Sequence, residues 1–191
     1  MTSLDSDSDE VLVTLAKLGD RMAFEHLVRR HKDELYRFVR RYVGHADDAY
    51  DVLQNCLVAA WLGLSRYDPA RAFAPWLRTI ALNKCRDFGR RQTVRRVFLT
   101  VFAQERAASE TLVGPEVASG EAAQRDARLD LLDSAIAGLP AFYKEPLLLT
   151  TVSGLSHEEA AALLKTTPKA IEMRLYRARR KLQALLGEPE G

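Results

Sequence analysis

The chain has 191 residues, 28 lysines and arginines against 26 aspartates and glutamates, and 47% hydrophobic residues, which fits one or two small domains. The longest uninterrupted apolar run, 57–64, is far shorter than the roughly 20 residues that cross a bilayer, so the composition excludes a membrane-spanning protein. Residues 1–10 carry acids and no lysine or arginine, unlike a secretory or transit peptide, and we expect a cytoplasmic protein with no membrane insertion.

The pattern of apolar residues predicts an all-α fold. Apolar side chains recur at helical spacing, and no segment alternates apolar and polar side chains as a half-buried strand would. The N-terminal half is expected to form four helices, over about 9–18, 20–43, 47–64 and 73–92. Gly19 and Gly44 separate the first three. The third has the strongest amphipathic pattern in the chain.

The apolar pattern weakens between residues 97 and 125, where Gly114-Pro115 and Ser119-Gly120 occur. Such a composition is typical of a linker, and we expect this one to be flexible at least in its second half. The sequence therefore predicts two small helical domains, a helical bundle at 1–96 and a second domain at 126–191, joined by a flexible linker at 97–125.

Neither cysteine is placed for metal binding or for a disulfide. Cys56 and Cys85 each lie in an apolar helical pattern, without a CxxC pair or a histidine at ligand spacing, and we expect reduced thiols in the core. The start of the third helix carries Asp47, Asp48 and Asp51. Their negative charges are expected to stabilise the helix through its dipole rather than to bind a metal. No metal site and no cofactor are expected.

A helix-turn-helix is expected near the C-terminus. Ser156 and Glu159 form a capping box that starts one helix at His157. Thr167 as N-cap and Pro168 as the first helical residue start a second helix. The turn of about three residues between the two helices is typical of this motif.

The second of these helices would present a basic face outward. Its inward stripe is Ile171, Leu175, Ala178, Leu182 and Leu185, and its opposite side carries Lys169, Met173, Tyr176, Arg177 and Arg180. This arrangement suits a recognition helix, whose outward face meets base edges and phosphates. The alternative is an ordinary helix with a solvated charged face.

Basic residues gather in two windows, 84–96 and 169–181, each with six lysines or arginines against one acid, which indicates two contacts with a polyanion. A stripe on the fourth helix, made of Thr79, Asn83, Arg86 and Arg90, suits base edges and phosphates.

The segment 66–73 before the fourth helix is expected to be a loop that carries arginines and aromatic side chains, a surface that can hold unstacked bases of single-stranded DNA. For Phe73 and Trp76, core packing is the alternative. On the third helix, Gln54 and Asn55 continue a polar face suited to a protein partner.

These residues resemble a known family. The segments DVLQ at 51–54, AW at 60–61, FAPWLRTIALN at 73–83 and DFGRR at 87–91 resemble region 2 of the extracytoplasmic-function (ECF) sigma factors of bacterial RNA polymerase. Leu139-Pro140, GLSHEEAA at 154–161 and RLYRARRKL at 174–182 resemble region 4 of the same family. The resemblance covers both expected domains in order.

The resemblance implies an alternative sigma factor, without catalysis of its own, that directs promoter recognition, DNA melting and transcription initiation. The implied partners are core RNA polymerase, through its beta-prime clamp and beta flap, promoter DNA, and an anti-sigma factor. By position, core polymerase would bind Asp48, Asp51, Val52, Gln54 and Asn55. The minus-ten DNA would bind Arg66, Tyr67, Arg71, Thr79, Asn83, Arg86 and Arg90. The minus-thirty-five DNA would bind Lys169, Glu172, Met173, Arg174, Tyr176, Arg177 and Arg180.

The sequence departs from the family pattern at three places. The recognition helix starts with Lys169-Ala170-Ile171, and Glu172 can accept a hydrogen bond from a cytosine amino group, so an unusual promoter sequence is expected. Pro146 lies inside the helix expected after Leu139-Pro140, so that helix is expected to start late or to kink. Asn55 stands where the family usually has an acid.

The main alternative is a self-sufficient helix-turn-helix transcription regulator, whose N-terminal half senses a ligand or dimerises. Such a regulator would bind its promoter without polymerase, usually at a palindrome. The N-terminal half has a nucleic-acid face of its own and no ligand-pocket motif, which favours the sigma factor. An enzyme is disfavoured, because the chain shows no nucleophile with a base and no Gly-rich phosphate loop.

Overall fold

The computed structural model describes residues 7–69, 71–103 and 121–186. Its elements are α1 (Asp9–Lys17), α2 (Arg21–Val43), α3 (Ala46–Gly63), the short 3-10 helix η2 (Leu64–Arg66), α4 (Phe73–Ala103), α5 (Glu121–Gly138), α6 (Ala141–Thr151), α7 (His157–Leu164) and α8 (Pro168–Leu186). These three stretches contain no strand, which confirms the predicted all-α class. None of the described helices combines the length and apolar character of a membrane span.

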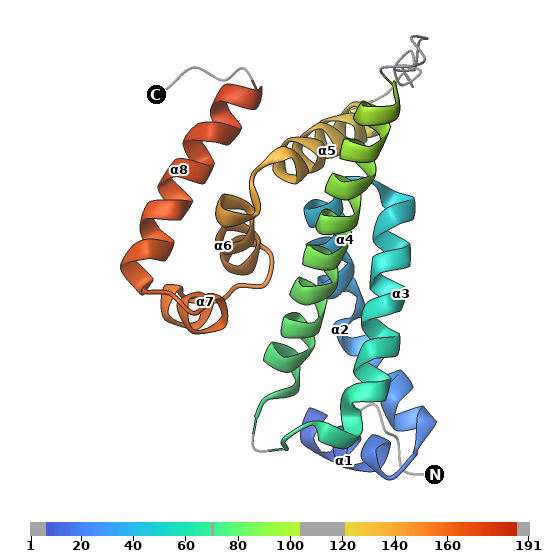
Figure 1. The fold of residues 1–191 in the computed structure, drawn as a ribbon. Coiled ribbons are helices and arrows are strands. Elements are labelled where there is room, and N and C mark those ends of the chain that lie inside the picture. Colours follow the sequence, from blue (N-terminus) through green and yellow to red (C-terminus); the bar gives the residue numbers. More distant parts are fainter. Residues whose placement is uncertain (1–6, 70, 104–120, 187–191) are drawn as a thin grey trace.

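The first unit packs α1 to α4 around one apolar core (Figure 1). Local signals set the ends of α2, because the Asp20 side chain accepts hydrogen bonds from the backbone N–H groups of Met22 at 2.9 Å and Ala23 at 3.2 Å, and Gly44 ends the helix in the left-handed region. Fully buried side chains of this core include Leu12, Leu27, Val39, Cys56, Leu82 and Cys85. Burying these side chains leaves the polar sides of α3 and α4 outside.

Both cysteines are free and buried, as predicted. Burial raises the pKa of the Cys56 thiol to about 12 and also raises the pKa of Cys85. Both thiols are therefore protonated at neutral pH and belong to the core.

The second unit contains α5 to α8. Leu148 and Leu149 of α6, Ala160 of α7, and Ile171 and Ala178 of α8 are completely buried and pack into one cluster. In Figure 1, α6 lies between α8 (red) and α4 (green). The side of α8 that faces away from α6 is therefore also turned away from the first unit.

The two units touch through the C-terminal part of α2, which contacts α5 and α6. The segment predicted as a linker, 97–125, is helical at both ends, since α4 continues to Ala103 and α5 begins at Glu121. The predicted linker is therefore too long at both ends, because a helix that has already nucleated adds further residues at little cost, even the valines, phenylalanines and threonine of 97–103. Residues 104–120 lie outside the described residues, so the expected flexibility is not tested there.

Of the two outcomes expected for the helix after Leu139-Pro140, the late start is wrong, because α6 begins at Ala141 and runs through Pro146. A kink at Pro146 stays a prediction. Pro146 is fully buried, and the hydrogen bond that the helix loses there is the one to the carbonyl of Phe142. Leu185, expected in the inward stripe of α8, is 60% exposed because α8 extends beyond the helices that cover its inner face.

Candidate nucleic-acid interfaces

The helix-turn-helix forms as its capping residues predict. The Glu159 backbone N–H donates to Ser156 Oγ at 3.1 Å, and Glu159 Oε2 accepts from the Ser156 N–H at 2.8 Å, so both halves of the capping box are present. Lys165 adopts a left-handed conformation with φ of 52°, which turns the chain. The Thr167 hydroxyl then accepts from the Ala170 N–H at 3.2 Å and starts α8.

The outward side of α8 carries the side chains predicted to bind the minus-thirty-five DNA. Six of the seven are exposed: Lys169, Glu172, Met173, Tyr176, Arg177 and Arg180. Ile171, Leu175 and Ala178 are buried on the opposite side, so the helix cannot present another face. A surface that combines cationic, aromatic and thioether groups can meet phosphates and bases together.

Glu172 is the one acid on this outward side of α8. Lys169 Nζ donates to Glu172 Oε2 at 2.8 Å, and this hydrogen bond lowers the pKa of Glu172. The carboxylate is therefore an acceptor at neutral pH, as a contact to a cytosine amino group requires.

Arg174 lies apart from the other predicted contacts. Its guanidinium sits 3.9 Å from the centroid of the Phe142 ring, and its Nη2 lies 3.4 Å from the Thr166 hydroxyl. Its buried Nε has no hydrogen-bond partner among the described residues. In this structure the side chain stabilises the packing of α8 on α6, and its guanidinium would have to leave Phe142 to reach a phosphate.

The predicted stripe on α4 lies on one continuous helix but its members face different surroundings. Thr79 and Asn83 are exposed, and the Thr79 hydroxyl donates to the Pro75 carbonyl at 2.9 Å. Arg90 is exposed and paired with Asp87 one turn earlier. Arg86 is half-buried and turns toward the second unit.

The loop before α4 is built on a buried aromatic cluster. Tyr67, predicted to touch minus-ten DNA, is 5% exposed, and its ring centroid lies 4.9 Å from that of Trp76 and 6.0 Å from that of Phe73. Its hydroxyl donates to the carbonyl of Arg71. Tyr67 therefore supports the loop from inside, whereas Arg66 and Arg71 are exposed on it. Phe73 is a core residue, which the alternative of core packing had predicted.

The predicted polymerase-binding face of α3 is present except for Val52. Asp51, Gln54 and Asn55 are exposed and Asp48 is half-buried, but Val52 is 6% exposed and belongs to the core, because it lies on the apolar stripe of the helix. Between α3 and α4 runs a groove of about 230 Å³, whose lining includes acids of α3 opposite Lys84 and Arg91 of α4. Sequence analysis missed three exposed apolar side chains on α3: Tyr50, Val58 and Leu62.

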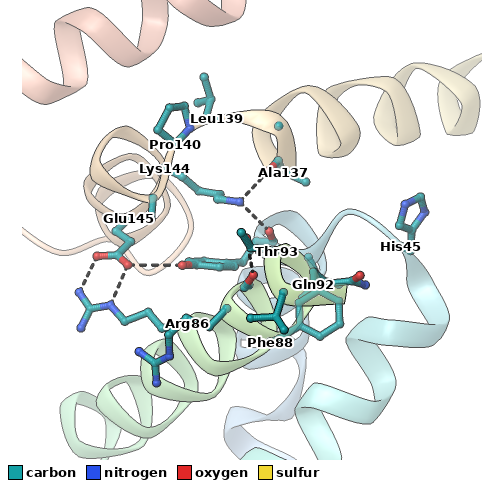
Figure 2. Close-up of a pocket in the computed structure, with 17 residues that line it drawn as sticks. His45, Arg86, Phe88, Gln92, Thr93, Ala137, Leu139, Pro140, Lys144 and Glu145 are labelled. Carbon is teal, nitrogen blue, oxygen red and sulfur yellow. Dashed lines mark hydrogen bonds and ion pairs between the residues drawn. The ribbon is translucent and has the colours of Figure 1, made fainter. Parts of the chain in front are cut away.

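Charged side chains join the two units. Arg86 donates to Glu145 of α6 twice, from Nε to Oε1 at 2.7 Å and from Nη2 to Oε2 at 2.5 Å. Glu145 is buried, and the Tyr42 hydroxyl lies 3.4 Å from its Oε1. Figure 2 shows the guanidinium of Arg86 facing the Glu145 carboxylate across the gap between the units. Two parallel charge-assisted hydrogen bonds give this pair both strength and a fixed geometry.

Lys144, the neighbour of Glu145, bridges the units from a buried position. Its Nζ donates to the Ala137 carbonyl at 2.7 Å and to the Tyr42 carbonyl at 3.1 Å, and it lies 4.5 Å from the centroid of the Tyr42 ring. Burial lowers the pKa of Lys144 to about 8. Burial, followed by the Glu145 charge, raises the pKa of Tyr42.

A second group of charges lies at the end of α2. Arg40 Nη2 pairs with Asp130 at 2.7 Å, Arg40 Nη1 lies 3.7 Å from Asp133, and Arg41 Nε lies 3.4 Å from Asp133. Sequence analysis missed these pairs and the Arg86–Glu145 pair, since their partners are far apart in the chain. The available signal for Glu145 was its place beside Lys144, close to the apolar run 147–149.

An open cavity of about 1020 Å³ lies along the contact between the two units. Its lining includes Phe88 and Arg90 of α4, and Leu139 and Pro140 between α5 and α6 (Figure 2). Arg90, predicted to bind DNA, thus borders the space between the two units.

Comparison with known proteins places both units in described families. The family described as Sigma-70 region 2 matches residues 27–95, and the family described as Sigma-70, region 4 matches residues 129–182. The RNA polymerase sigma factor CnrH of Cupriavidus metallidurans is 40% identical over 185 residues, which covers 94% of this chain and 95% of the relative. The ECF RNA polymerase sigma-E factor of Escherichia coli is 30% identical over 174 residues, covering 90% and 91%.

A solved structure of a sigma factor has a similar fold. The structure of CnrH in complex with the cytosolic domain of CnrY matches with a TM-score of 0.68 and 33% identity, covering 95% of this chain and 98% of that one. The similarity therefore extends over both units.

Proposed function

The chain belongs to the extracytoplasmic-function sigma factors of bacterial RNA polymerase, which are DNA-binding transcription initiation factors, and we propose how its residues divide this work. The first unit, up to about residue 96, binds core polymerase and the minus-ten element. The second unit, from about residue 126, binds the minus-thirty-five element. The chain acts in the cytoplasm with polymerase and carries no catalytic activity of its own.

The outward side of α8 reads the minus-thirty-five element. The observation that carries this proposal is the capped helix-turn-helix, whose second helix exposes one cationic and aromatic side and buries Ile171, Leu175 and Ala178 on the opposite side. Tyr176 and Arg177 lie near the middle of α8, on the same outward side as Glu172 and Met173 of its N-terminal half, the part that in this motif meets base edges in the major groove. Glu172 reads a cytosine there, and Lys169 contacts a phosphate.

The exposed side of α4 and the loop before it hold the minus-ten DNA. Thr79 and Asn83 supply hydrogen-bonding groups for bases, and Arg86 and Arg90 supply cations for phosphates. Arg66 and Arg71 lie on the loop, where they hold the strand of a flipped base. Tyr67 serves this site from the inside, because its ring supports the loop and its hydroxyl binds the Arg71 carbonyl.

The exposed side of α3 binds the beta-prime clamp of core polymerase. Asp51, Gln54 and Asn55 supply the polar part of this surface, with Val58 and Leu62 as its apolar part. Protein interfaces combine an apolar centre with a polar rim, and α3 offers both side by side. The second unit binds the beta flap.

An anti-sigma factor is the regulatory partner that we propose. The relative CnrH has been solved in complex with the cytosolic domain of CnrY, and this chain is similar to CnrH over almost its whole length. Large exposed apolar side chains on α3 supply a surface that such a partner can cover.

The experiment that tests the proposed function compares DNA binding with and without core polymerase. The purified chain is incubated with a library of duplex promoter fragments, alone or with core polymerase, and bound fragments are sequenced. We expect enrichment of a two-part promoter in the presence of polymerase. Tight, specific enrichment of a palindrome by the chain alone would instead support the self-sufficient regulator.

A further inference from the structure

The loop before α4, described at residues 67–69 and 71–72, is held by hydrogen bonds to its backbone. The Tyr67 hydroxyl donates to the Arg71 carbonyl, and the Arg71 N–H donates to the Asp68 carbonyl at 3.1 Å. From outside the loop, Lys17 Nζ of α1 donates to the Tyr67 carbonyl at 2.9 Å. None of these three bonds joins one core helix to another, so each acts on the shape of the loop.

Arg71 combines a held backbone with an exposed side chain. Its carbonyl and its N–H are both bonded within the loop, while its side chain is 79% exposed. Arg71 Nε lies 3.6 Å from Asp68 Oδ2, and an ion pair this exposed is weak in water. A cation on a backbone that is already fixed can bind a phosphate without the cost of ordering the loop first.

The side chain of Tyr67 fixes its hydroxyl beneath the loop. Its ring is packed against the rings of Phe73 and Trp76, so the position of the hydroxyl is set by the core. Burial, followed by the charge of Glu10, raises the pKa of Tyr67. The hydroxyl therefore keeps its proton at neutral pH and remains a donor to the Arg71 carbonyl.

Helix α1 supports the loop from a second direction. It lies at the end of the bundle where the chain passes from α3 to α4, and it contacts both η2 and α4 (Figure 1). Its first residue, Asp9, accepts from Arg30 Nη1 of α2 at 2.7 Å and lies 2.7 Å from His31 Nε2. The helix is thus fastened to α2 at its start, and Lys17 at its end reaches the loop.

We propose that Lys17 of α1, together with the Tyr67 hydroxyl, sets the base preference of the loop before α4 without touching DNA. The two groups are positioning residues, which hold the loop in the conformation in which Arg66 and Arg71 receive the flipped base. This inference rests on the proposed function, because it takes the loop as the site of that base. Only a promoter with the captured base gains from the held loop, so losing either group lowers the preference at that one position.

The first test measures base preference with the complete polymerase complex. Core polymerase with wild type, Lys17→Met or Tyr67→Phe is incubated with promoter fragments randomised across the minus-ten element, and bound fragments are sequenced. We expect the preference to fall about 3- to 10-fold at one position, the same for both variants, because fewer loops are in the competent conformation. Lys17→Arg keeps a cationic donor and should retain most of the preference.

Two control variants match these changes. Lys32→Met removes an exposed lysine of α2, and Tyr143→Phe removes a tyrosine hydroxyl from α6 of the second unit. Neither should change the preference at any minus-ten position. A loss for Lys17→Met that is equal on every sequence, with a salt slope smaller by about 1, would show that Lys17 binds a phosphate itself and would contradict the positioning role.

The second test measures the loop in the chain without polymerase, by amide hydrogen exchange. The peptide that contains Tyr67, Asp68 and Arg71 should exchange about 3-fold faster or more in Lys17→Met and in Tyr67→Phe than in wild type, because the Arg71 N–H leaves its bond more often. Peptides from the buried parts of α3 and α4 should exchange as in wild type, which shows that each variant is folded. Lys17 is exposed, so its variant tests the inference even if Tyr67→Phe does not fold.

Two results would overturn the inference. One is loop exchange that is unchanged in the folded variants. The other is an unchanged preference at every minus-ten position, although wild type and variants all enrich a two-part promoter with polymerase. In both cases the wild-type chain still directs polymerase, so the proposed function stands and this inference alone is lost. A wild-type chain that enriches no two-part promoter would remove the proposed function, and this inference with it.

Discussion

The guanidinium of Arg86 and the carboxylate of Glu145, 59 residues apart in the sequence, form a two-point hydrogen-bonded pair across the two units. A double-mutant cycle with Arg86→Gln and Glu145→Gln should give a coupling free energy of about 1–3 kcal/mol in urea unfolding. Arg86→Gln should be the more destabilising single change, because it leaves the buried Glu145 charge without its cation, whereas Arg86 is reached by water. A coupling energy near zero would show that the pair does not form in solution.

Gly44→Ala should destabilise the protein more than Gly19→Ala. Both glycines have φ of 98°, so an alanine at either position is strained by about 1–2 kcal/mol. A Cβ at Gly44 would lie 2.7 Å from the Ala137 Cβ of the second unit, whereas a Cβ at Gly19 has open space. This close approach should add about 1–3 kcal/mol to the loss at Gly44, measured by thermal or urea unfolding.

A companion variant separates the two causes at Gly44. Ala137→Gly removes the atom that the new Cβ would meet, so combining it with Gly44→Ala should recover the added loss and leave the backbone strain. Equal losses for Gly44→Ala and Gly19→Ala would mean that α2 and α5 are not in contact.

Lys144 should contribute stability that rises with pH between about 8 and 10, measured as the difference between wild type and Lys144→Met, because the raised pKa of the buried Cys56 and Cys85 lowers the stability of both proteins over the same window. Burial lowers the pKa of this lysine to about 8 in the folded chain, with Tyr42, Glu145, Cys85 and Arg86 around it. In the unfolded chain the lysine keeps its proton to near its ordinary pKa, so at this residue the unfolded state binds more protons in this window and its contribution to the free energy of unfolding increases with pH. The gain is on the order of 1–2 kcal/mol.

Lys144→Met should lose this rise, and the measurement is urea unfolding of both proteins at pH 8, 9 and 10. Above about pH 10, the raised pKa of Tyr42 opposes further gain, because the unfolded tyrosine then releases a proton that the folded one keeps. Parallel pH curves for wild type and Lys144→Met would contradict the buried position of the ammonium group.

Arg177→Ala should change promoter choice as well as affinity. If Arg177 makes a bidentate base contact from the outward side of α8, the loss of about 1–3 kcal/mol falls on one position of the minus-thirty-five element. Sequencing of bound promoters with the polymerase complex of each protein measures this. A loss that is equal for every sequence, with a weaker salt dependence, would assign Arg177 to a phosphate instead.

Local signals predicted several helix ends, because the atoms that cap a helix are close in sequence. The capping box at Ser156 and Glu159, the cap at Thr167 and the break at Gly44 are formed as expected. The same local reasoning placed six minus-thirty-five residues on the exposed side of α8.

Sequence analysis failed where burial depends on tertiary packing. Tyr67 and Val52 were expected to face DNA and polymerase, but both are core residues, since the aromatic cluster and the α3 stripe cover them. Arg86 shares a helical stripe with Asn83, yet its surroundings are decided by Glu145 of a distant helix. The spacing of residues along α4 therefore cannot predict that Arg86 contacts the second unit.

The central claim, that this chain directs polymerase to melt a two-part promoter, is tested most directly by permanganate footprinting of the unpaired thymines. The purified chain, core polymerase and a promoter from the enriched library are combined, with each protein alone as control. We predict reactive thymines at the minus-ten element only when both proteins are present, and their loss with Asn83→Ala and Arg90→Ala. Reactivity that does not depend on the chain, or specific duplex binding by the chain without melting, would contradict the account.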